Sequence, residues 1–298
     1  MATSWLTDVP EMSRRDLLTI RQTLDSAYRN FSREYGEGIE AFFDPLLHFL
    51  VWFEDLLLTT PWWLVIAVLA GIAYLASRSW KLPAAVVISF TLIGYLGMWE
   101  DTMSTLSIIL VCTLVAIGVG VPTGIAMSKS NRTQAVVTPL LDIMQTMPAF
   151  VYLIPVVMLL GIGKIPGVIA VVIYAIPPVI RLTNLGIRLV DKDVLEAATA
   201  YGANGFQRLF QVQLPLAMPT IMAGINQTIM MALAMVVIAS MIGVSGLGQP
   251  VLKSITNQYF TLGLLNGLAI VVIAIIFDRV SQSYAKRSQQ HLKGGDHD

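Results

Sequence analysis

The sequence predicts an all-α, polytopic membrane protein, and two observations carry this prediction: the composition of the chain and the length of its apolar runs. Of the 298 residues, 55% are hydrophobic and only 13% are charged, whereas a soluble domain carries about 25% charged residues. A helix needs about 20 mainly apolar residues to cross a hydrocarbon core about 30 Å thick. Runs of that length recur along the chain, and we expect each to be a transmembrane helix.

About seven such spans are expected. They lie near residues 62–78, 82–99, 104–128, 135–160, 166–187, 218–243 and 261–279. The fourth and fifth are interrupted by Pro139, Pro148, Pro155, Pro177 and Pro178. Lipid tolerates a broken helix only where protein or a water-filled cavity satisfies the freed backbone groups. These two spans are therefore expected to face the protein interior.

Basic residues gather in alternate loops and predict the orientation of the chain. One set of loops holds Arg78, Lys81, Lys129, Arg132, Arg188, Lys192, Arg208, Lys286, Arg287 and Lys293. Loops rich in Lys and Arg face the cytoplasm. The opposite loops hold Glu100 and Asp101 with the isolated Lys164 and Lys253. Seven spans then place the C-terminal tail, residues 286–298, in the cytoplasm and the N-terminus outside.

The N-terminal tail, residues 1–61, is acidic and precedes the first span. It holds ten Asp or Glu and five Arg, and no uninterrupted apolar core follows a basic start, so a cleavable signal peptide is not expected. Residues 42–58 read FFDPLLHFLVWFEDLLL, with polar breaks at Asp44, His48 and Asp55. Charged side chains are unfavourable in hydrocarbon, so we expect an amphipathic helix in the membrane interface rather than an eighth span. His48 belongs to its polar stripe.

The sequence lacks the patterns of a catalytic, nucleotide or metal site. A phosphate cradle requires G-x-x-x-x-G-K-[ST], but the pair Gly163-Lys164 is followed by Ile165 and has Met158 where the first glycine belongs. Neither H-E-x-x-H nor G-x-S-x-G occurs, the three histidines are dispersed, and Cys112 is the single cysteine. We expect no enzyme activity, bound cofactor, metal or nucleic-acid partner for this chain.

One orderly polar segment, residues 191–217, interrupts the apolar second half of the chain. Residues 196–219 read EAATAYGANGFQRLFQVQLPLAMP. Asp191 and Asp193 favour the start of a helix, Gly202 permits a turn, and an apolar stripe at i, i+3, i+4 spacing follows. The pattern predicts helix, turn and helix on the cytoplasmic face. From periodicity alone, an amphipathic loop resting on lipid head groups is the alternative interpretation.

The spacing within this segment is specific. It follows E-A-A-x3-G-x9-[I/V]-x-L-P, with Glu196, Ala197, Ala198, Gly202, Val212, Leu214 and Pro215 at the defined positions. This resembles the signature loop of ABC importer permeases. PLLDIMQTMPAFVYLIPVVMLLGIG (139–163) and QLPLAMPTIMAGINQTIMMALAMVVIASMIGVSGLGQ (213–249) look like the permease subunit of glycine betaine/proline betaine importers. The resemblance covers about residues 62–285.

The resemblance implies a type I ABC importer permease core in the bacterial inner membrane, with the N-terminal tail periplasmic. It also implies that the seven motif residues couple this chain to a separate ATPase. Two copies of the chain would form the pathway and two cytoplasmic ATPase subunits, which hold ATP and Mg²⁺, would open it alternately. A periplasmic or membrane-anchored solute-binding protein would capture the solute. Glycine betaine, proline betaine, choline, carnitine, histidine and proline all remain open as the solute.

Polar groups within the spans, and a methionine whose flexible thioether side chain could form a hydrophobic gate, are candidates for a translocation pathway. The polar candidates are Asp142, Gln145, Asn226, Gln227 and Ser240, and the methionine is Met147. Asp142 would cost about 2.5–3.5 kcal/mol at a helix centre, so it either lines the pathway or pairs with a backbone or Arg group. Asn226, Gln227 and Ser240 either line the pathway or bond between helices, and the Gly120-x-x-x-Gly124 pattern indicates close helix contact. Phe150, Tyr152 and Tyr174 are too few to indicate a cation-π cage.

Two other classes of protein compete with the importer interpretation. A secondary transporter driven by an ion gradient would need ionisable pairs near the membrane midplane, and Asp142 is the single strong candidate acid. A membrane scaffold or sensor would account for the N-terminal helix. Neither explains the segment at residues 191–217.

Overall fold

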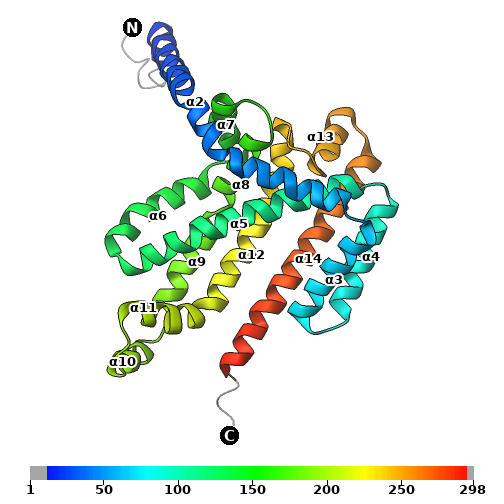
Figure 1. Cartoon of the computed structure of the whole chain (residues 1–298). Helices are drawn as coiled ribbons and strands as arrows, with labels where there is room; N and C mark the ends of the chain where they lie inside the picture. Colours follow the sequence, from blue (N-terminus) through cyan, green and yellow to red (C-terminus); the bar gives the residue numbers. More distant parts are fainter. Residues whose placement is uncertain (1–11, 294–298) are drawn as a thin grey trace, which may run out of the picture.

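The computed structural model describes residues 12–293, with side chains up to residue 285, and every regular element in that part of the chain is helical. Residues 1–11 and 294–298 of the two expected tails lie outside the described residues. The elements in chain order (Figure 1) are α2 (Arg14–Thr59), α3 (Trp62–Ser77), α4 (Lys81–Tyr95), α5 (Trp99–Lys129), α6 (Asn131–Thr146), η1 (Ala149–Tyr152), α7 (Leu153–Leu160), α8 (Lys164–Ala175), α9 (Pro177–Arg188), α10 (Lys192–Ala200), α11 (Gly205–Gln207), η2 (Arg208–Gln213), α12 (Leu214–Ala239), η3 (Ser240–Ile242), α13 (Gly248–Asn257) and α14 (Phe260–Lys293).

The count of seven spans needs correction. Four helical stretches in the described chain are long and apolar enough to cross a membrane, namely α5, 164–188, 205–242 and 260–285, and the number reaches six if two sharply bent helix pairs each count as one span. The bent pairs are α2 with α3, at 110°, and α6 with η1 and α7, at 111°. Helix α4, expected as a span, has only 15 residues.

The bend after α6 explains why residues 135–160 do not form one straight span. Met147 has extended backbone angles, φ −70° and ψ 134°, and precedes Pro148. A proline ring clashes with a helical conformation of the residue before it, so α6 ends at Thr146. Pro177 and Pro178 have a milder effect because they occupy the first turn of α9, where a proline needs no hydrogen-bonded N–H.

Helix α9 packs against α5 and α12, where glycines on these two helices allow its close approach. A Cβ at Gly124 of α5 would stand 2.6 Å from the Thr183 Cβ and 2.7 Å from the Ile180 carbonyl oxygen of α9. A Cβ at Gly224 of α12 would stand 3.1 Å from the Val179 Cα. The close contact predicted for the Gly120-x-x-x-Gly124 pattern is confirmed, since Gly120 also packs against Val179.

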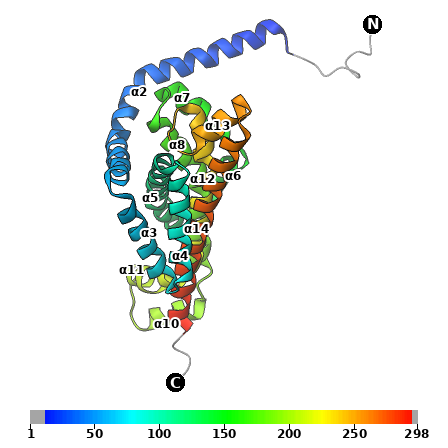
Figure 2. The same ribbon diagram turned by 90° about the vertical axis from the view of Figure 1, so that its right-hand side faces the viewer.

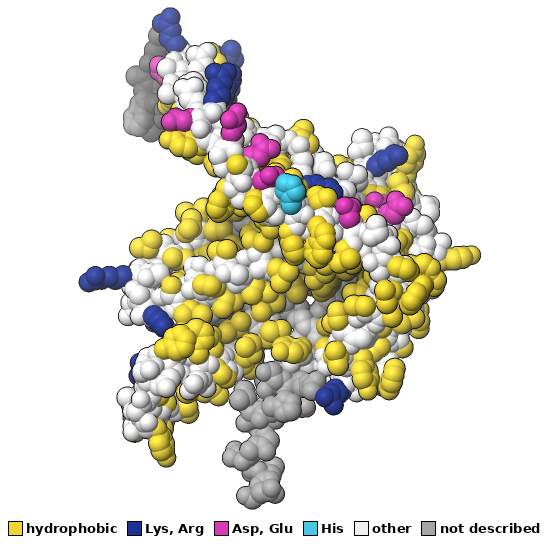
Figure 3. Space-filling model, in the orientation of Figure 1, with side chains coloured by type: hydrophobic (Ala, Val, Ile, Leu, Met, Phe, Trp, Pro, Cys, Tyr) yellow, Lys and Arg dark blue, Asp and Glu magenta, His cyan; other side chains and the backbone are white. Residues whose placement is uncertain are grey.

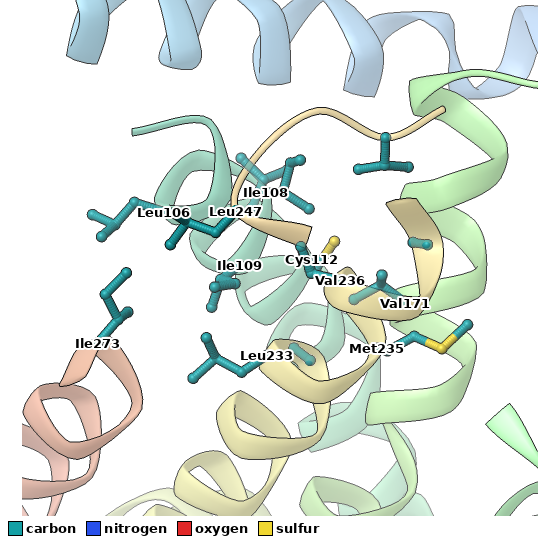
Figure 4. Packing of buried hydrophobic residues seen from close by; sticks show 14 of the residues in the cluster. Leu106, Ile108, Ile109, Cys112, Val171, Leu233, Met235, Val236, Leu247 and Ile273 are labelled. Atoms are coloured by element: carbon teal, nitrogen blue, oxygen red, sulfur yellow. The ribbon is translucent and has the colours of Figure 1, made fainter. Parts of the chain in front are cut away.

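A second packing centre lies toward the end of the bundle where α13 is found. Figure 4 shows Leu106, Ile109 and Cys112 of α5 meeting Val236 of α12 and Ile273 of α14, all of them buried. The connection before α13 is fixed to this core because the Leu247 N–H donates to the Thr105 Oγ1, at 2.9 Å. These contacts hold α5, α12 and α14 together beyond the glycine-lined part of the bundle.

Helix α2 is much longer than the expected segment 42–58, since it has 46 residues. Its second half crosses the bundle beside α5, and its first half projects over α7 (Figure 2). The Tyr28 hydroxyl donates to the Pro155 carbonyl oxygen and Ser32 Oγ donates to that of Met158, at 3.3 Å. His48 is exposed beside Asp44, in agreement with its place on a polar stripe.

A buried ion pair ties α2 to the bundle. The Glu54 Oε2 lies 2.5 Å from the Lys164 Nζ at the start of α8, and Ser104 Oγ of α5 donates to the Glu54 Oε1 at 2.8 Å. Glu54 is 6% exposed. A buried carboxylate is tolerated only when it is paired and hydrogen-bonded, and here both oxygens have partners. Lys164, expected to be isolated in a loop, is the countercharge.

Three of the segments expected to be basic lie at the end of the bundle opposite to the loops expected to be acidic. The α3–α4 turn, α10 and the end of α14 share the lower end in Figures 1 and 2, whereas α7, α13 and the α4–α5 connection lie toward the other. In Figure 3 the acidic side chains on the visible face gather near α2 and the upper right, above a largely apolar surface. The described chain thus has the charge asymmetry expected of an oriented membrane protein.

Packing around α9 predicts the effect of adding one methyl group to α5. Gly124→Ala should lower the free energy of unfolding by about 1–3 kcal/mol, because overpacked cores force backbone shifts of that magnitude. Gly118→Ala is the matched control, since nothing lies within 4 Å of a Cβ there and alanine favours a helix. Thermal unfolding of both variants in detergent measures the difference. Equal stability of the two variants would contradict the close approach.

The Glu54 pair makes a second prediction. Glu54→Gln should destabilise the protein because Lys164 loses its countercharge, although by less than the roughly 3–5 kcal/mol typical of a fully buried pair, since the Lys164 side chain is 32% exposed. Asp55→Asn, an exposed neighbour, should have little effect. Denaturant titration in detergent provides the measurement. Glu54→Gln and Asp55→Asn with equal midpoints would show that the pair contributes nothing.

Candidate docking surface and pathway residues

The predicted helix, turn and helix at residues 191–217 are present and well capped. The Asp191 Oδ1 accepts a hydrogen bond from the Asp193 N–H, at 2.9 Å, and α10 starts between them. Gly202 has φ +83°, which confirms the turn, because only glycine adopts this left-handed conformation without strain. Asn204 and Gln207 then form a reciprocal capping box that starts α11.

Helix α10 presents an exposed groove. Glu196 and Ala197 are exposed, and Ala198 is half-buried. The groove, with a volume of about 440 Å³, is lined by Lys192, Leu195, Glu196, Thr199, Ala200 and Arg208. The Arg208 Nη1 donates to the Thr199 Oγ1 at 3.1 Å and so fixes the return chain against α10. Small side chains beside a mixed-charge groove suit close docking of another protein surface.

The remaining motif residues form the root of the element. Val212, Leu214 and Pro215 are half-buried, and Pro215 lies in the first turn of α12. Leu209 is buried against Ile187, Val190, Ala217 and Ile221. The seven motif residues therefore divide into a mainly exposed part on α10 and its turn and a half-buried part that joins the element to α9 and α12. The sequence did not indicate that Arg208 and Thr199 line the groove and share a hydrogen bond, because neither residue belongs to the motif.

Exposed aromatic side chains extend the same surface. Tyr201 is 94% exposed at the turn. Phe206 and Phe210, both exposed, have ring centroids 4.4 Å apart. Large exposed aromatic groups commonly mark surfaces that another protein covers. The predicted apolar stripe therefore divides, with Leu209 turned inward and the two phenylalanines turned outward.

The six pathway candidates do not meet in one place. Asp142 and Gln145 lie one turn apart on α6, and both are exposed in the single chain. Asp142 forms an ion pair with Arg181 of α9, which is the Arg pairing that the sequence left open. Met147 is half-buried at the end of α6, where it packs against the main core.

The candidates on α12 have different surroundings. Asn226 Nδ2 donates to the Asp278 Oδ1 of α14 at 2.8 Å, so it bonds between helices, while Gln227 is exposed. Ser240, which follows α12 in η3, is buried and donates to the Val237 carbonyl oxygen of α12, at 2.6 Å. Asp278, which also accepts from Gln282 Nε2 at 2.7 Å, is a second acid within a span. Its position within an apolar run could have identified it from the sequence, but this signal was overlooked.

Of the three aromatic residues considered for a cation-π cage, two are in contact and the third is exposed. Tyr152 and Tyr174 meet edge to face, with centroids 6.0 Å apart, and Phe150 is exposed. Among the described residues, no group of three or more His, Cys, Asp or Glu could hold a metal ion.

Comparison with known proteins agrees with this geometry. The family described as binding-protein-dependent transport system inner membrane component matches residues 116–290, which include α10, α11 and their root. The chain belongs to this family.

The two similar curated proteins cover most of the chain. The glycine betaine/proline betaine transport system permease protein ProW of Escherichia coli (strain K12) is 49% identical over 245 residues, 82% of this chain and 69% of its own. The glycine betaine/carnitine transport permease protein GbuB of Listeria monocytogenes serotype 1/2a (strain 10403S) is 47% identical over 240 residues, 80% of this chain and 84% of its own.

A solved structure shares the fold of this inner membrane component. A chain of the MetNI methionine ABC transporter, in an inward-facing conformation, superposes with a TM-score of 0.57 at 18% identity. The superposition covers 62% of this chain and 93% of that one. The all-α membrane fold with a type I ABC importer permease core, expected from the sequence, is confirmed.

The turn at Gly202 predicts a graded response to substitution. Gly202→Val should disrupt the α10–α11 element and transport, since a left-handed residue with a Cβ costs about 1–2 kcal/mol or more. Gly202→Asn should retain more activity because Asn tolerates this conformation. Gly205→Val is the control, since its φ is not positive and nothing lies within 4 Å of a Cβ there. Hydrogen exchange of residues 192–208 and solute uptake check the order, and equal loss in all three variants would contradict it.

Proposed function

We propose that this chain is the permease subunit of an ATP-driven importer that translocates a compatible solute such as glycine betaine. The observation that carries the proposal is the exposed α10–α11 element, which has a docking groove on one side and a root in the bundle on the other. The family and the names of the two similar permeases support it. The sequence holds no phosphate cradle, so the energy source belongs to a partner.

The partner on the α10 side is a cytoplasmic ATPase subunit. Glu196, Lys192 and Arg208 offer both signs of charge around small alanine side chains, which suits a groove on a folded protein better than a uniformly anionic lipid surface. We infer two copies of this chain and two ATPase subunits, which hold ATP and Mg²⁺. The basic end of the bundle then faces the cytoplasm, and the start of α2 lies in the periplasm.

The mechanism follows from the position of α9. Closure of the ATPase subunits moves α10, and residues 189–191 join α10 directly to α9. Because α9 is packed closely against α5 and α12 through glycines, it moves with them as one body. Two such bodies, one from each copy of the chain, open the pathway alternately to the two sides of the membrane. The permease itself forms or breaks no covalent bond.

The solute passes between faces that are exposed in a single chain. Gln145 and the Asp142–Arg181 pair on α6 and α9, with Gln227 on α12, present polar groups there. Asn226 and Ser240 are hydrogen-bonded within the bundle and Met147 packs against the core, so these three support the helices beside the pathway instead of contacting the solute. A periplasmic or membrane-anchored solute-binding protein captures the solute, so the pathway requires little affinity of its own.

A reconstitution experiment tests the proposed function. Proteoliposomes that contain this chain, its ATPase and the solute-binding protein should take up radiolabelled glycine betaine only with internal ATP and Mg²⁺. Omission of any protein should abolish uptake, and excess carnitine, choline, histidine and proline should report specificity by competition. Uptake driven by an ion gradient through the lone chain would overturn the proposal in favour of a secondary transporter.

A further inference from the structure

A cleft away from the docking surface and the proposed pathway lies between α3, α4 and the start of α5. It has a volume of about 370 Å³, within the range of roughly 300–1,000 Å³ typical of small-molecule sites. Ile66 and Phe90 are buried at its floor, and Trp62, Tyr95 and Trp99 form its walls. Four of the seven lining residues are thus aromatic.

The position of the Trp99 ring is set by the backbone of α4. A Cβ at Gly94 would stand 3.4 Å from the Trp99 Cε3, so the ring packs on the glycine at the end of α4. Trp62 begins α3, Tyr95 ends α4 and Trp99 begins α5. The aromatic walls therefore lie at the helix ends, at the level where a membrane protein meets the lipid head groups.

The charged residues that adjoin this cleft along the chain are acidic. No Lys or Arg occurs between Arg33 and Arg78 or between Lys81 and Lys129. Glu100 and Asp101 follow Trp99 directly in the first turn of α5. Figure 3 shows acidic side chains above the apolar surface of α3 and α4 on the right of the molecule. Aromatic faces attract an organic cation, and neighbouring carboxylates strengthen that preference.

The cleft continues into an apolar track along the flank of the helix pair. Val87 and Ile88 lie one turn from Thr91 on α4, on the same side of the helix, and both are exposed. A small zwitterionic solute has no group to cover this track. A lipid has one, since its acyl chain would run along α4 while its head group lies among the aromatic rings.

We propose that this cleft binds a phospholipid whose head group carries an ammonium group. The ammonium lies against the faces of Trp62, Tyr95 and Trp99 near the Glu100 carboxylate, and an acyl chain covers Val87 and Ile88. A head group without a positive charge gains neither interaction. The site is independent of the proposed transport function because none of its residues belongs to the docking surface or the pathway.

Native mass spectrometry of the full chain in detergent, with phosphatidylethanolamine, phosphatidylcholine and phosphatidylglycerol of identical acyl chains, tests the site. The two ammonium lipids should be retained at least about threefold better than phosphatidylglycerol, the scale of one cation-π contact. Trp99→Phe should keep most of this preference, while Trp99→Ala and Glu100→Gln should reduce it. Size-exclusion chromatography establishes that each variant is folded.

Trp63→Ala is the matched control. Trp63 is adjacent to Trp62 on α3, and both are 58% exposed, but Trp63 does not line the cleft. Its replacement should leave the head-group preference unchanged. Equal retention of all three lipids, or equal effects of Trp63→Ala and Trp99→Ala, would overturn the proposal in favour of ordinary interfacial anchoring. Calorimetric binding of free glycine betaine to lipid-stripped protein, lost in Trp99→Ala, would assign the cleft to the solute and also overturn it.

Discussion

The close approach of α9 to its two neighbours is the constraint on which the rest of the bundle depends. In lipid, apolar side chains gain little by moving from the hydrocarbon into contact with one another, because both surroundings are apolar. Helices therefore associate through close packing and hydrogen bonds. Gly124 lets α5 meet the backbone of α9 on one side, and Gly224 lets α12 meet it on the other. Gly186 of α9 adds a third close contact, since its Cβ would stand 2.9 Å from that of Thr220. Three helices that touch at backbone distance have little freedom to slide.

Three carboxylates of the described bundle have side-chain partners on other helices. Glu54 is paired with Lys164 and also accepts from Ser104, so α2, α5 and α8 share one polar contact. Asp142 pairs with Arg181, and Asp278 accepts from Asn226. Each contact joins helices distant in sequence, and removing Lys164 would leave the buried Glu54 carboxylate without its countercharge in surroundings of low dielectric constant. Such contacts fix the mutual orientation of helices whose apolar surfaces alone are not specific.

Sequence reasoning was most successful where a local pattern determines a local conformation. Gly120 and Gly124 predicted close packing, and Gly202 predicted the turn, because a missing Cβ has the same consequence in any fold. It was less successful where neighbours decide the outcome. The apolar run at 135–160 gave no measure of the 111° bend. The length of α2 and the bonding of Asp278 depend on α7 and α12 respectively, and no spacing in the sequence reports those contacts.

The order of the elements connects the exposed α10–α11 element to the membrane bundle at both ends. Helix α10 follows α9 after three residues, and η2 leads without interruption into α12. The exposed element is therefore attached at both ends to helices that pack against each other over their length. Leu209 and Leu214 pack in one apolar cluster with Val190 and Ile187. The connections of the α10–α11 element to α9 and α12 are therefore packed segments and not flexible linkers. In the proposed mechanism, a force applied at Glu196 reaches α9 and α12 together, and the glycine contacts then pass it to α5. We propose that this series of packed contacts allows α10 to move the membrane bundle.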